Sequence, residues 1–139
     1  MEKVWDPLRR KDVALTPEER VRQWFISLLR DSLGVPVHQM MSEVGLQYGA
    51  GKVYRADIVV YARGGHPLAI VECKRPEVTL SQATFEQALR YDMVLGVPFI
   101  FVTNGHSTFV ARRAGEGYEF LKKIPTYVEM SGYGDKGTE

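Results

Sequence analysis

The stretch RADIVVYARGGHPLAIVECKRP, residues 55–76, consists of two apolar runs joined by a pair of glycines. A Gly-Gly pair between runs of β-branched residues indicates a hairpin with a tight turn. Charged side chains nevertheless interrupt both runs at positions where a strand would normally carry apolar residues: Asp57, Glu72 and Lys74.

The register of this hairpin decides which charged residues meet. A turn centred on the glycine pair places Asp57 directly opposite Glu72. Facing residues have Cβ atoms about 4.5–5.5 Å apart, so the two carboxylates repel each other unless a cation lies between them. Lys74 projects from the same face as Glu72, whereas Cys73 points to the other face and is expected to be a buried apolar filler.

Two carboxylates and an amine on one surface favour a site for a divalent cation. Oxygen ligands that leave positions open suit Mg²⁺, which keeps waters, takes phosphate oxygens and lowers the pKa of a bound water. The Lys74 ammonium can orient that water or stabilise charge that develops on a phosphate. The pattern therefore predicts metal-assisted hydrolysis of a phosphodiester.

The spacing also permits a purely structural interpretation. Diagonal contacts across the hairpin would join Arg55 to Glu72 and Lys74 to Asp57 as ordinary salt bridges on a solvated face. Spacing alone leaves both interpretations open.

Length and composition limit the domain organisation and the partners. With 139 residues and 45% hydrophobic content, the chain is expected to form one domain, with residues 1–14 as an extension and residues 131–139 as a disordered tail. A net charge of +1 gives no global basic field, so a nucleic acid must be held by a local patch or through a metal. One cysteine and no apolar leader or membrane span favour a cytoplasmic protein.

Capping signals and periodicity place the other elements. A helix is expected to begin after Thr16, with Pro17 in its first turn and Glu19 at the capping-box spacing. Its apolar positions recur at helical spacing and are Val21, Trp24, Phe25, Leu28 and Leu29. Strands are expected over residues 37–48, 52–62, 66–75, 98–105, 107–113 and 118–123, with a second helix over residues 79–96. This order predicts an α/β fold with a central mixed sheet flanked by helices.

An Asp on one strand followed, after a hairpin, by Glu-x-Lys resembles the signature of the PD-(D/E)xK nuclease superfamily. Further segments, in the same order, are similar to the N-terminal nuclease domain of type I restriction enzyme R subunits: TPEERVRQ (16–23), RADIVVY (55–61), VECKRPEV (71–78), QALRY (87–91) and VTNG (102–105). The resemblance implies a restriction-endonuclease-like core and a DNA endonuclease that requires Mg²⁺, with Mn²⁺ able to substitute.

The resemblance also implies roles for individual residues. Asp57 and Glu72 become metal ligands, the main-chain carbonyl of Cys73 a third ligand, and Lys74 the catalytic amine. Ala56 stands where the motif has its leading proline, a departure that leaves these groups in place.

The family's Q-x-x-x-Y element falls on Gln87 and Tyr91. They lie on one helical face, which is expected to pack toward the sheet and to border the active site, although roles as buried core residues remain open. The helix that carries them is expected to begin with a capping box formed by Thr79 and Gln82.

Two further acids are additional candidates for the site. Glu19 occupies the place of a first-helix glutamate that some related nucleases hold near the metal, but its capping role is sufficient to explain it. Glu43, in the first strand of the core, is more simply explained as a solvated edge residue. The histidines have no ligand spacing and do not indicate a zinc site.

Basic residues near these elements are the expected phosphate contacts: Arg20, Arg22, Arg75, Arg112 and Arg113. The sequence contains no phosphate-binding loop of the G-x-x-x-x-G-K-[ST] kind, so it carries no motor of its own. Expected partners are DNA, separate motor or specificity subunits of a restriction-modification system, or a second copy in a homodimer. A non-cleaving nucleic-acid-binding module and a structural subunit of a restriction-like assembly remain as alternatives.

Overall fold

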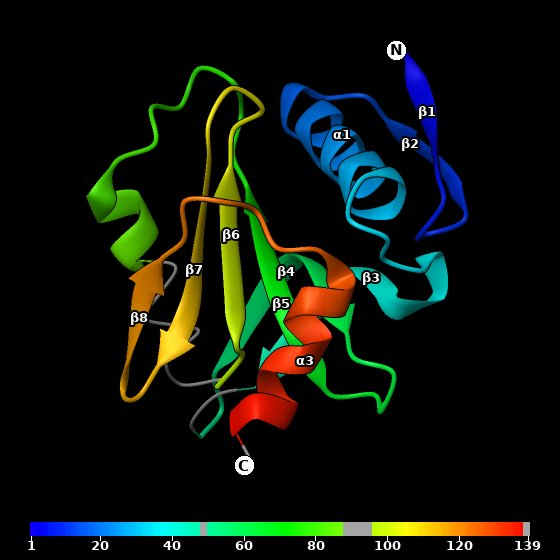
Figure 1. The fold of residues 1–139 in the computed structure, drawn as a ribbon. Coiled ribbons are helices and arrows are strands. Elements are labelled where there is room, and N and C mark those ends of the chain that lie inside the picture. Colours follow the sequence, from blue (N-terminus) through cyan, green and yellow to red (C-terminus); the bar gives the residue numbers. More distant parts are fainter. Residues whose placement is uncertain (48–49, 88–95, 138–139) are drawn as a thin grey trace.

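A six-stranded sheet forms the centre of the computed structural model, which describes residues 1–47, 50–87 and 96–137 (Figure 1). Its strands, in spatial order, are β3 (Met40–Gln47), β4 (Val53–Tyr61), β5 (Pro67–Cys73), β6 (Phe99–Thr103), β7 (Thr108–Ala114) and β8 (Gly117–Phe120). β5 and β6 run parallel and the other neighbours antiparallel. The mixed α/β sheet expected from the sequence is confirmed.

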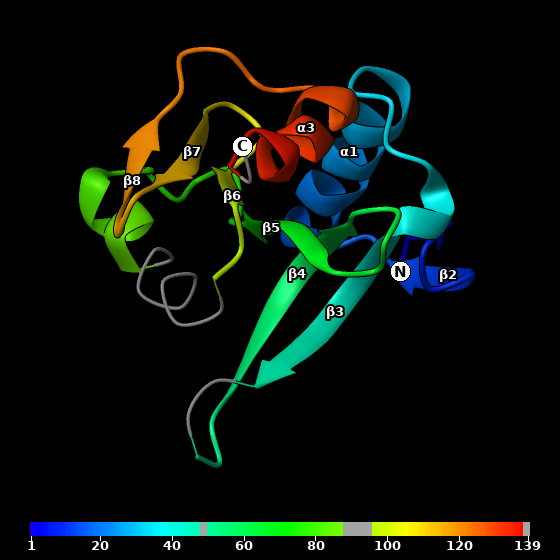
Figure 2. The same cartoon turned by 60° about the horizontal axis from the view of Figure 1, so that its bottom comes forward.

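Helices cover both faces of the sheet, so its central strands are apolar on both sides. All of β6 is buried, as its continuous apolar run indicates. On one face, Phe25 of α1 (Pro17–Asp31) packs edge-on against Phe101, with ring centroids 5.7 Å apart. On the other face, Phe85 from the helical residues 82–87 packs in a second core with Ile100. Figure 2 shows α1 together with α3 (Tyr127–Gly137) on the first of these faces.

The expected start of α1 is confirmed. Thr16 has an extended backbone, and its hydroxyl accepts a 3.1 Å hydrogen bond from the Glu19 amide, with Pro17 in the first turn. One apolar position differs from expectation, because Trp24 is 44% exposed while the adjacent Phe25 is fully buried.

The second helix is capped by a different residue from the one expected. Ser81 Oγ accepts a 3.3 Å hydrogen bond from the Thr84 amide, which makes Ser81 the cap. The Gln82 side chain reaches forward to Glu86, at 3.0 Å, and not back to Thr79. Ser81 is also a residue type that commonly caps helices and lies two positions after Thr79, so residue type alone does not decide between them.

The first fourteen residues form a hairpin of their own. β1 (Lys3–Asp6) and β2 (Lys11–Ala14) pair antiparallel, and Figure 1 shows them beside α1. A turn of 3₁₀ helix, η1 (Val37–Gln39), then leads from α1 into β3. The four-residue strands are too short to show a clear alternation, so the sequence indicated only an extension.

The expectation of a disordered tail after residue 130 is wrong for residues 131–137, because α3 continues to Gly137. The start of this helix is anchored, since Met130 is fully buried and the Tyr127 hydroxyl donates a 2.9 Å hydrogen bond to the Tyr61 carbonyl. The glycine-rich composition of this segment does not predict a helix. The contacts of Tyr127 and Met130 hold the helix in place.

Within the part of the chain that the structure describes, no helix combines the length and apolar character needed to cross a bilayer.

We expect Thr16→Ala to lower the free energy of unfolding by about 1 kcal/mol, because the Glu19 amide loses its cap. The matched control is Thr79→Ala, at the exposed position that the sequence also marks as a cap, and it should change stability by less than about 0.5 kcal/mol. Urea denaturation followed by circular dichroism measures both, and equal losses would contradict the assigned caps.

Candidate active site

Neighbouring strands β3 and β4 are irregular at the same rung. Their regular pairing skips one position, at which Glu43 faces Asp57, and Glu43 has φ +54, in the left-handed region. Ala56 packs in one core and Ile58 in the core on the other side of the sheet, so the alternation of β4 breaks at Asp57. Such breaks re-aim a side chain and are frequent beside active sites.

The β4–β5 register agrees with the expected alignment up to the last rung. From Val60 to Ile58 the residues of β4 face the expected partners on β5, and Ile58 pairs with Val71. A β-bulge between Val60 and Tyr61 shifts the pairing by one residue next to the turn. Regular pairing then stops, so Asp57 and Glu72 do not form the directly opposed pair expected from the sequence. Instead, Asp57 Oδ2 accepts a 2.6 Å hydrogen bond from the Cys73 amide, which brings the carboxylate to the peptide that links Glu72 to Cys73.

Glu72 and Lys74 project from the same face, as their spacing predicts. Lys74 Nζ lies 3.6 Å from Glu72 Oε1, and the Tyr54 hydroxyl donates a hydrogen bond to Glu72 Oε2. The Lys74 amide donates a 2.8 Å hydrogen bond to the Thr103 carbonyl, which ties the lysine to the carboxyl end of β6. Both side chains are partly exposed, so they are accessible to a ligand.

The salt bridges of the structural interpretation are not found among the described residues. The Arg55 guanidinium donates instead to the Glu43 main-chain carbonyl at 2.8 Å, and Lys74 pairs with Glu72. Asp57 has no ion-pair partner among the residues that the structure describes.

Burial raises the pKa of Asp57 to about 6. The hydrogen bond from the Cys73 amide opposes this shift, the negative charge of Glu72 adds to it, and the more distant Arg22 cation lowers it. A desolvated carboxylate beside a second acid, with no cation paired to it, is more typical of a functional site than of a structural ion pair. Burial also raises the pKa of the Cys73 thiol well above its usual value, which agrees with its expected role as an apolar filler.

A buried ion network connects the N-terminal hairpin to α1. Arg9, in the β1–β2 turn, donates to the fully buried Asp6 and, at 2.6 Å, to Glu19. Burial alone would raise the pKa of Asp6, but hydrogen bonds from Arg9 and the Leu8 amide hold it below its usual value. The Glu19 side chain therefore serves this network, whereas only its main-chain amide serves the cap.

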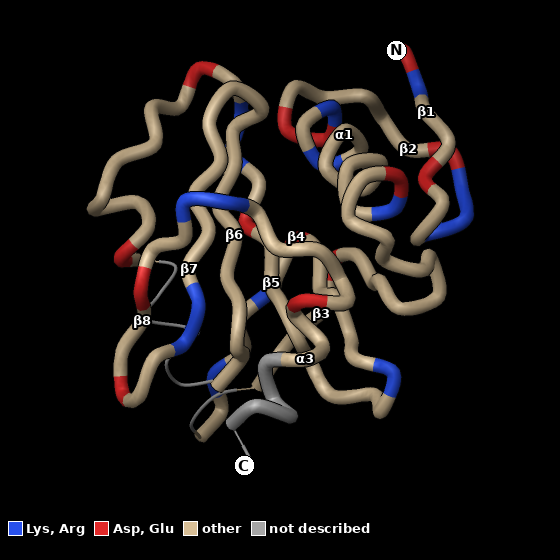
Figure 3. Tube along the Cα trace, in the orientation of Figure 1, with Lys and Arg blue, Asp and Glu red and all other residues tan. Residues whose placement is uncertain are grey.

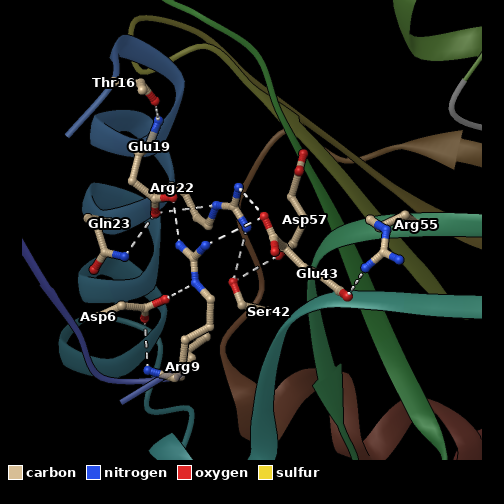
Figure 4. Close-up of polar contacts among 11 residues, drawn as sticks. Asp6, Arg9, Thr16, Glu19, Arg22, Gln23, Ser42, Glu43, Arg55 and Asp57 are labelled. Atoms are coloured by element: carbon tan, nitrogen blue, oxygen red, sulfur yellow. Dashed lines mark hydrogen bonds and ion pairs between the residues drawn. The ribbon is translucent and has the colours of Figure 1, made fainter. Parts of the chain in front are cut away.

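The network continues from α1 to the irregular rung (Figure 4). The buried Arg22 lies 3.4 Å from a carboxylate oxygen of Glu19 and 3.4 Å from one of Glu43. It also donates a 3.2 Å hydrogen bond to Ser42, whose hydroxyl donates one of 3.2 Å to the Asp57 carbonyl. Glu43 is thus a bound member of the site rather than a free edge residue, and no local spacing in the sequence indicated this.

The expected phosphate contacts lie in three different places. Arg22 is buried in the network, so its assignment to DNA contact is wrong. Arg20 and Arg75 have exposed side chains on α1 and directly after Lys74. Arg112 and Arg113 belong to the end of β7 that pairs with the start of β6, at the opposite end of the sheet from the site. Figure 3 shows basic and acidic positions interspersed along the trace, which agrees with the small net charge.

The Q-x-x-x-Y element is only partly within the described chain. Gln87 is exposed, and the residue of this turn that packs toward the sheet is Phe85, so the expected orientation of Gln87 is wrong. Tyr91 lies outside the described residues.

The donor types near Asp57 are those that a hard cation accepts. No group of three or more His, Cys, Asp or Glu side chains in the described residues is placed to hold a metal ion. Mg²⁺, however, commonly takes one or two carboxylates and completes its shell with waters and phosphate oxygens. Asp57, Glu72 and the Cys73 carbonyl provide oxygen donors of that kind.

Residues 17–125 match the family model described as type I restriction enzyme R protein N terminus (HSDR_N). The chain belongs to this family. The matched segment includes α1, the irregular rung and the end of β5, and therefore Asp57, Glu72 and Lys74. Asp6 and Arg9 of the ion network precede it.

Two relatives show how much of a larger protein this HSDR_N chain represents. The endonuclease subunit of the type I restriction enzyme EcoAI from Escherichia coli is 40% identical over 74 residues, which are 52% of this chain and 9% of that subunit. A solved fragment from Vibrio vulnificus YJ016, described as an HsdR subunit of a type I restriction enzyme, has 25% identity and a TM-score of 0.64. It covers 90% of this chain and 27% of its own, and it confirms the expected restriction-endonuclease-like fold.

Replacing Arg22 tests how much this arginine stabilises the acids around it. We expect Arg22→Met to lower the free energy of unfolding by about 3 kcal/mol, because the buried Glu19 and the facing Glu43 lose a cation. The control Arg20→Met removes an exposed pair with Glu2 and should cost less than about 1 kcal/mol. Similar losses in urea denaturation would show that the network contributes no more than a surface pair.

The raised pKa of Asp57 predicts a specific pH dependence of stability. Between pH about 4 and 6 the folded state keeps a proton that the unfolded state releases, so this group makes stability fall as the pH rises. Asp57→Asn cannot ionise, so its stability relative to the wild type should increase by on the order of 2 kcal/mol from pH 4 to pH 7. Denaturation at both pH values without divalent cations measures this, and a constant difference would contradict the assignment.

Proposed function

We propose that this domain is a Mg²⁺-dependent endonuclease that hydrolyses DNA phosphodiester bonds. The observation that carries the proposal is Asp57, a desolvated carboxylate with a raised pKa that contacts the peptide adjoining Glu72 and has no cation paired to it in the described chain. The Escherichia coli relative is named an endonuclease subunit, which supports the same class of activity.

Asp57, Glu72 and the main-chain carbonyl of Cys73 would hold the cation. When bound, Mg²⁺ supplies positive charge that offsets the repulsion of the carboxylates and polarises a phosphate oxygen, and Mn²⁺ is expected to substitute. A proton on Asp57 competes with the cation, so binding should weaken as the pH falls below about 6.

Lys74 and Tyr54 have separate roles in this proposal. The Lys74 ammonium, 3.6 Å from Glu72 and partly exposed, can donate to a phosphate oxygen and stabilise the negative charge that grows there during hydrolysis, or can orient the attacking water. The Tyr54 hydroxyl holds the Glu72 carboxylate, which limits its rotation.

The proposed partners depend on how much of its relatives' length this chain matches. It spans 9% of the Escherichia coli subunit, and its sequence contains no phosphate-binding loop of its own. We therefore propose that it acts on DNA together with the motor and specificity parts of a restriction-modification system. A homodimer would bring two sites to the two strands of a duplex.

A second candidate is a DNA-binding module that does not cleave. It is favoured by the contacts of Glu72, whose carboxylate already has both Lys74 and Tyr54 as partners. Such a domain would bind DNA without a metal requirement.

The proposal predicts that the purified domain cleaves plasmid or single-stranded DNA in the presence of Mg²⁺ or Mn²⁺, and that EDTA abolishes this cleavage. Asp57→Ala and Lys74→Ala should each lower the rate by at least about 100-fold, because they remove a ligand and the phosphate-facing amine. The matched controls are Asp31→Ala, at the exposed end of α1, and Lys52→Ala, in the exposed loop before β4, which should keep the wild-type rate.

Three outcomes of this assay separate the candidates. Loss of cleavage in the site variants alone supports hydrolysis at Asp57. Binding of DNA by the wild type without any cleavage supports the non-cleaving module, and neither binding nor cleavage supports a structural subunit.

A further inference from the structure

The exposed indole of Trp24 is explained neither by the core nor by the carboxylate site. Its neighbours on α1, Val21 and Phe25, are buried, whereas Trp24 is 44% exposed. It lines a hollow of about 250 Å³ whose other walls come from α1, the chain after Lys74 and the loop after β6: Arg20, Pro76, Asn104, Gly105 and His106.

The loop that forms one wall has a fixed shape. The side-chain oxygen of the buried Asn104 accepts hydrogen bonds from the main-chain amides of His106 and Ser107, at 2.9 and 2.8 Å. The side-chain nitrogen of Asn104 donates a 2.8 Å hydrogen bond to the Val78 carbonyl. Gly105 has φ +90, a conformation that side chains disfavour. The loop is therefore held in place before any ligand arrives, which explains the VTNG segment that the proposed hydrolysis leaves unused.

The hollow lies at the same end of the sheet as Lys74. Pro76 follows Lys74 by two residues, a span of at most about 7 Å. Asn104 follows Thr103, whose carbonyl accepts the hydrogen bond from the Lys74 amide. Figure 1 shows the loop after β6 near α1, the helix that carries Arg20 and Trp24.

The chemistry of this surface suits an unpaired nucleotide. Arg20 lines the hollow beside the partly exposed indole, and Lys74 and Arg75 precede Pro76, which forms another wall. The side chains of Arg20 and Arg75 are 65% and 58% exposed. Proteins bind single-stranded DNA by stacking bases on aromatic rings while nearby cations meet the phosphates. A base within a duplex has both faces covered by its neighbours, so only an unstacked base can enter.

We propose that this hollow is a binding subsite for one unpaired nucleobase of the DNA strand whose phosphate lies at Lys74. The inference deepens the proposed nuclease function and rests on it. It assigns Trp24 as the stacking residue and gives the domain a preference for single-stranded or frayed DNA over an intact duplex.

The test measures binding in EDTA, where cleavage does not interfere. The chain has two tryptophans, so Trp5→Phe leaves Trp24 as the one indole that reports fluorescence. Titration with oligodeoxythymidylate of about 12 nucleotides should quench this fluorescence saturably, and a hairpin duplex of equal length should quench it much less.

Affinity of the same oligonucleotide for Trp24 variants then tests the stacking role. Trp24→Ala should weaken binding of the single strand about 10-fold or more, and Trp24→Phe should retain most of the affinity. The matched control is Trp5→Ala, which removes the other exposed indole, on β1, and should bind as the wild type does. Unfolding curves of both alanine variants verify that the fold is intact.

The outcomes distinguish this subsite from the proposed hydrolysis. Equal binding by the two alanine variants, or no binding of single-stranded DNA by the wild type, overturns the subsite whether or not the domain cleaves. Binding that depends on Trp24, in a domain that shows no cleavage with Mg²⁺ or Mn²⁺, keeps the subsite and overturns the hydrolysis.

Discussion

A carboxylate taken out of water needs a compensating partner, and this requirement organises the domain. Asp6 and Glu19 are buried and each contacts an arginine, so their charges contribute to a connected network. Asp57 is also desolvated, but its contact in the described chain is a main-chain amide, and its pKa is raised to about 6. Desolvation thus acts on all three acids. Asp6 and Glu19 are stabilised by arginines and have a structural role, whereas Asp57 lacks such a partner in the described chain and is the candidate reactive acid.

The arginine network gives the first fourteen residues a role in the core of the domain. Arg9 joins the N-terminal hairpin to Glu19, and Arg22 carries the connection to Glu43 and Ser42, beside the main chain of Asp57. The left-handed backbone of Glu43 is sustained by these contacts, since an isolated residue would relax from it. The position of Asp57 thus depends on segments that are far apart in the sequence.

The candidate site residues gather at the carboxyl ends of the parallel strands β5 and β6, where open α/β sheets commonly bind ligands. Lys74 follows β5 at this end, the fixed loop around Asn104 follows β6, and α1 brings Trp24 beside that loop. Arg112 and Arg113 lie at the opposite end, so they are separated from this surface by the length of β6. Membership in the HSDR_N family agrees with a site built on this sheet.

Local signals in the sequence were sufficient for the order of α1 and the six sheet strands, the cap at Thr16 and the shared face of Glu72 and Lys74. Periodicity and turn chemistry act over a few residues, so one chain segment determines them. The break at Asp57, the bound state of Glu43, the burial of Arg22 and the exposure of Trp24 were decided only by the tertiary structure. Each depends on which distant residues meet across the sheet and α1, and no spacing along the chain encodes that meeting.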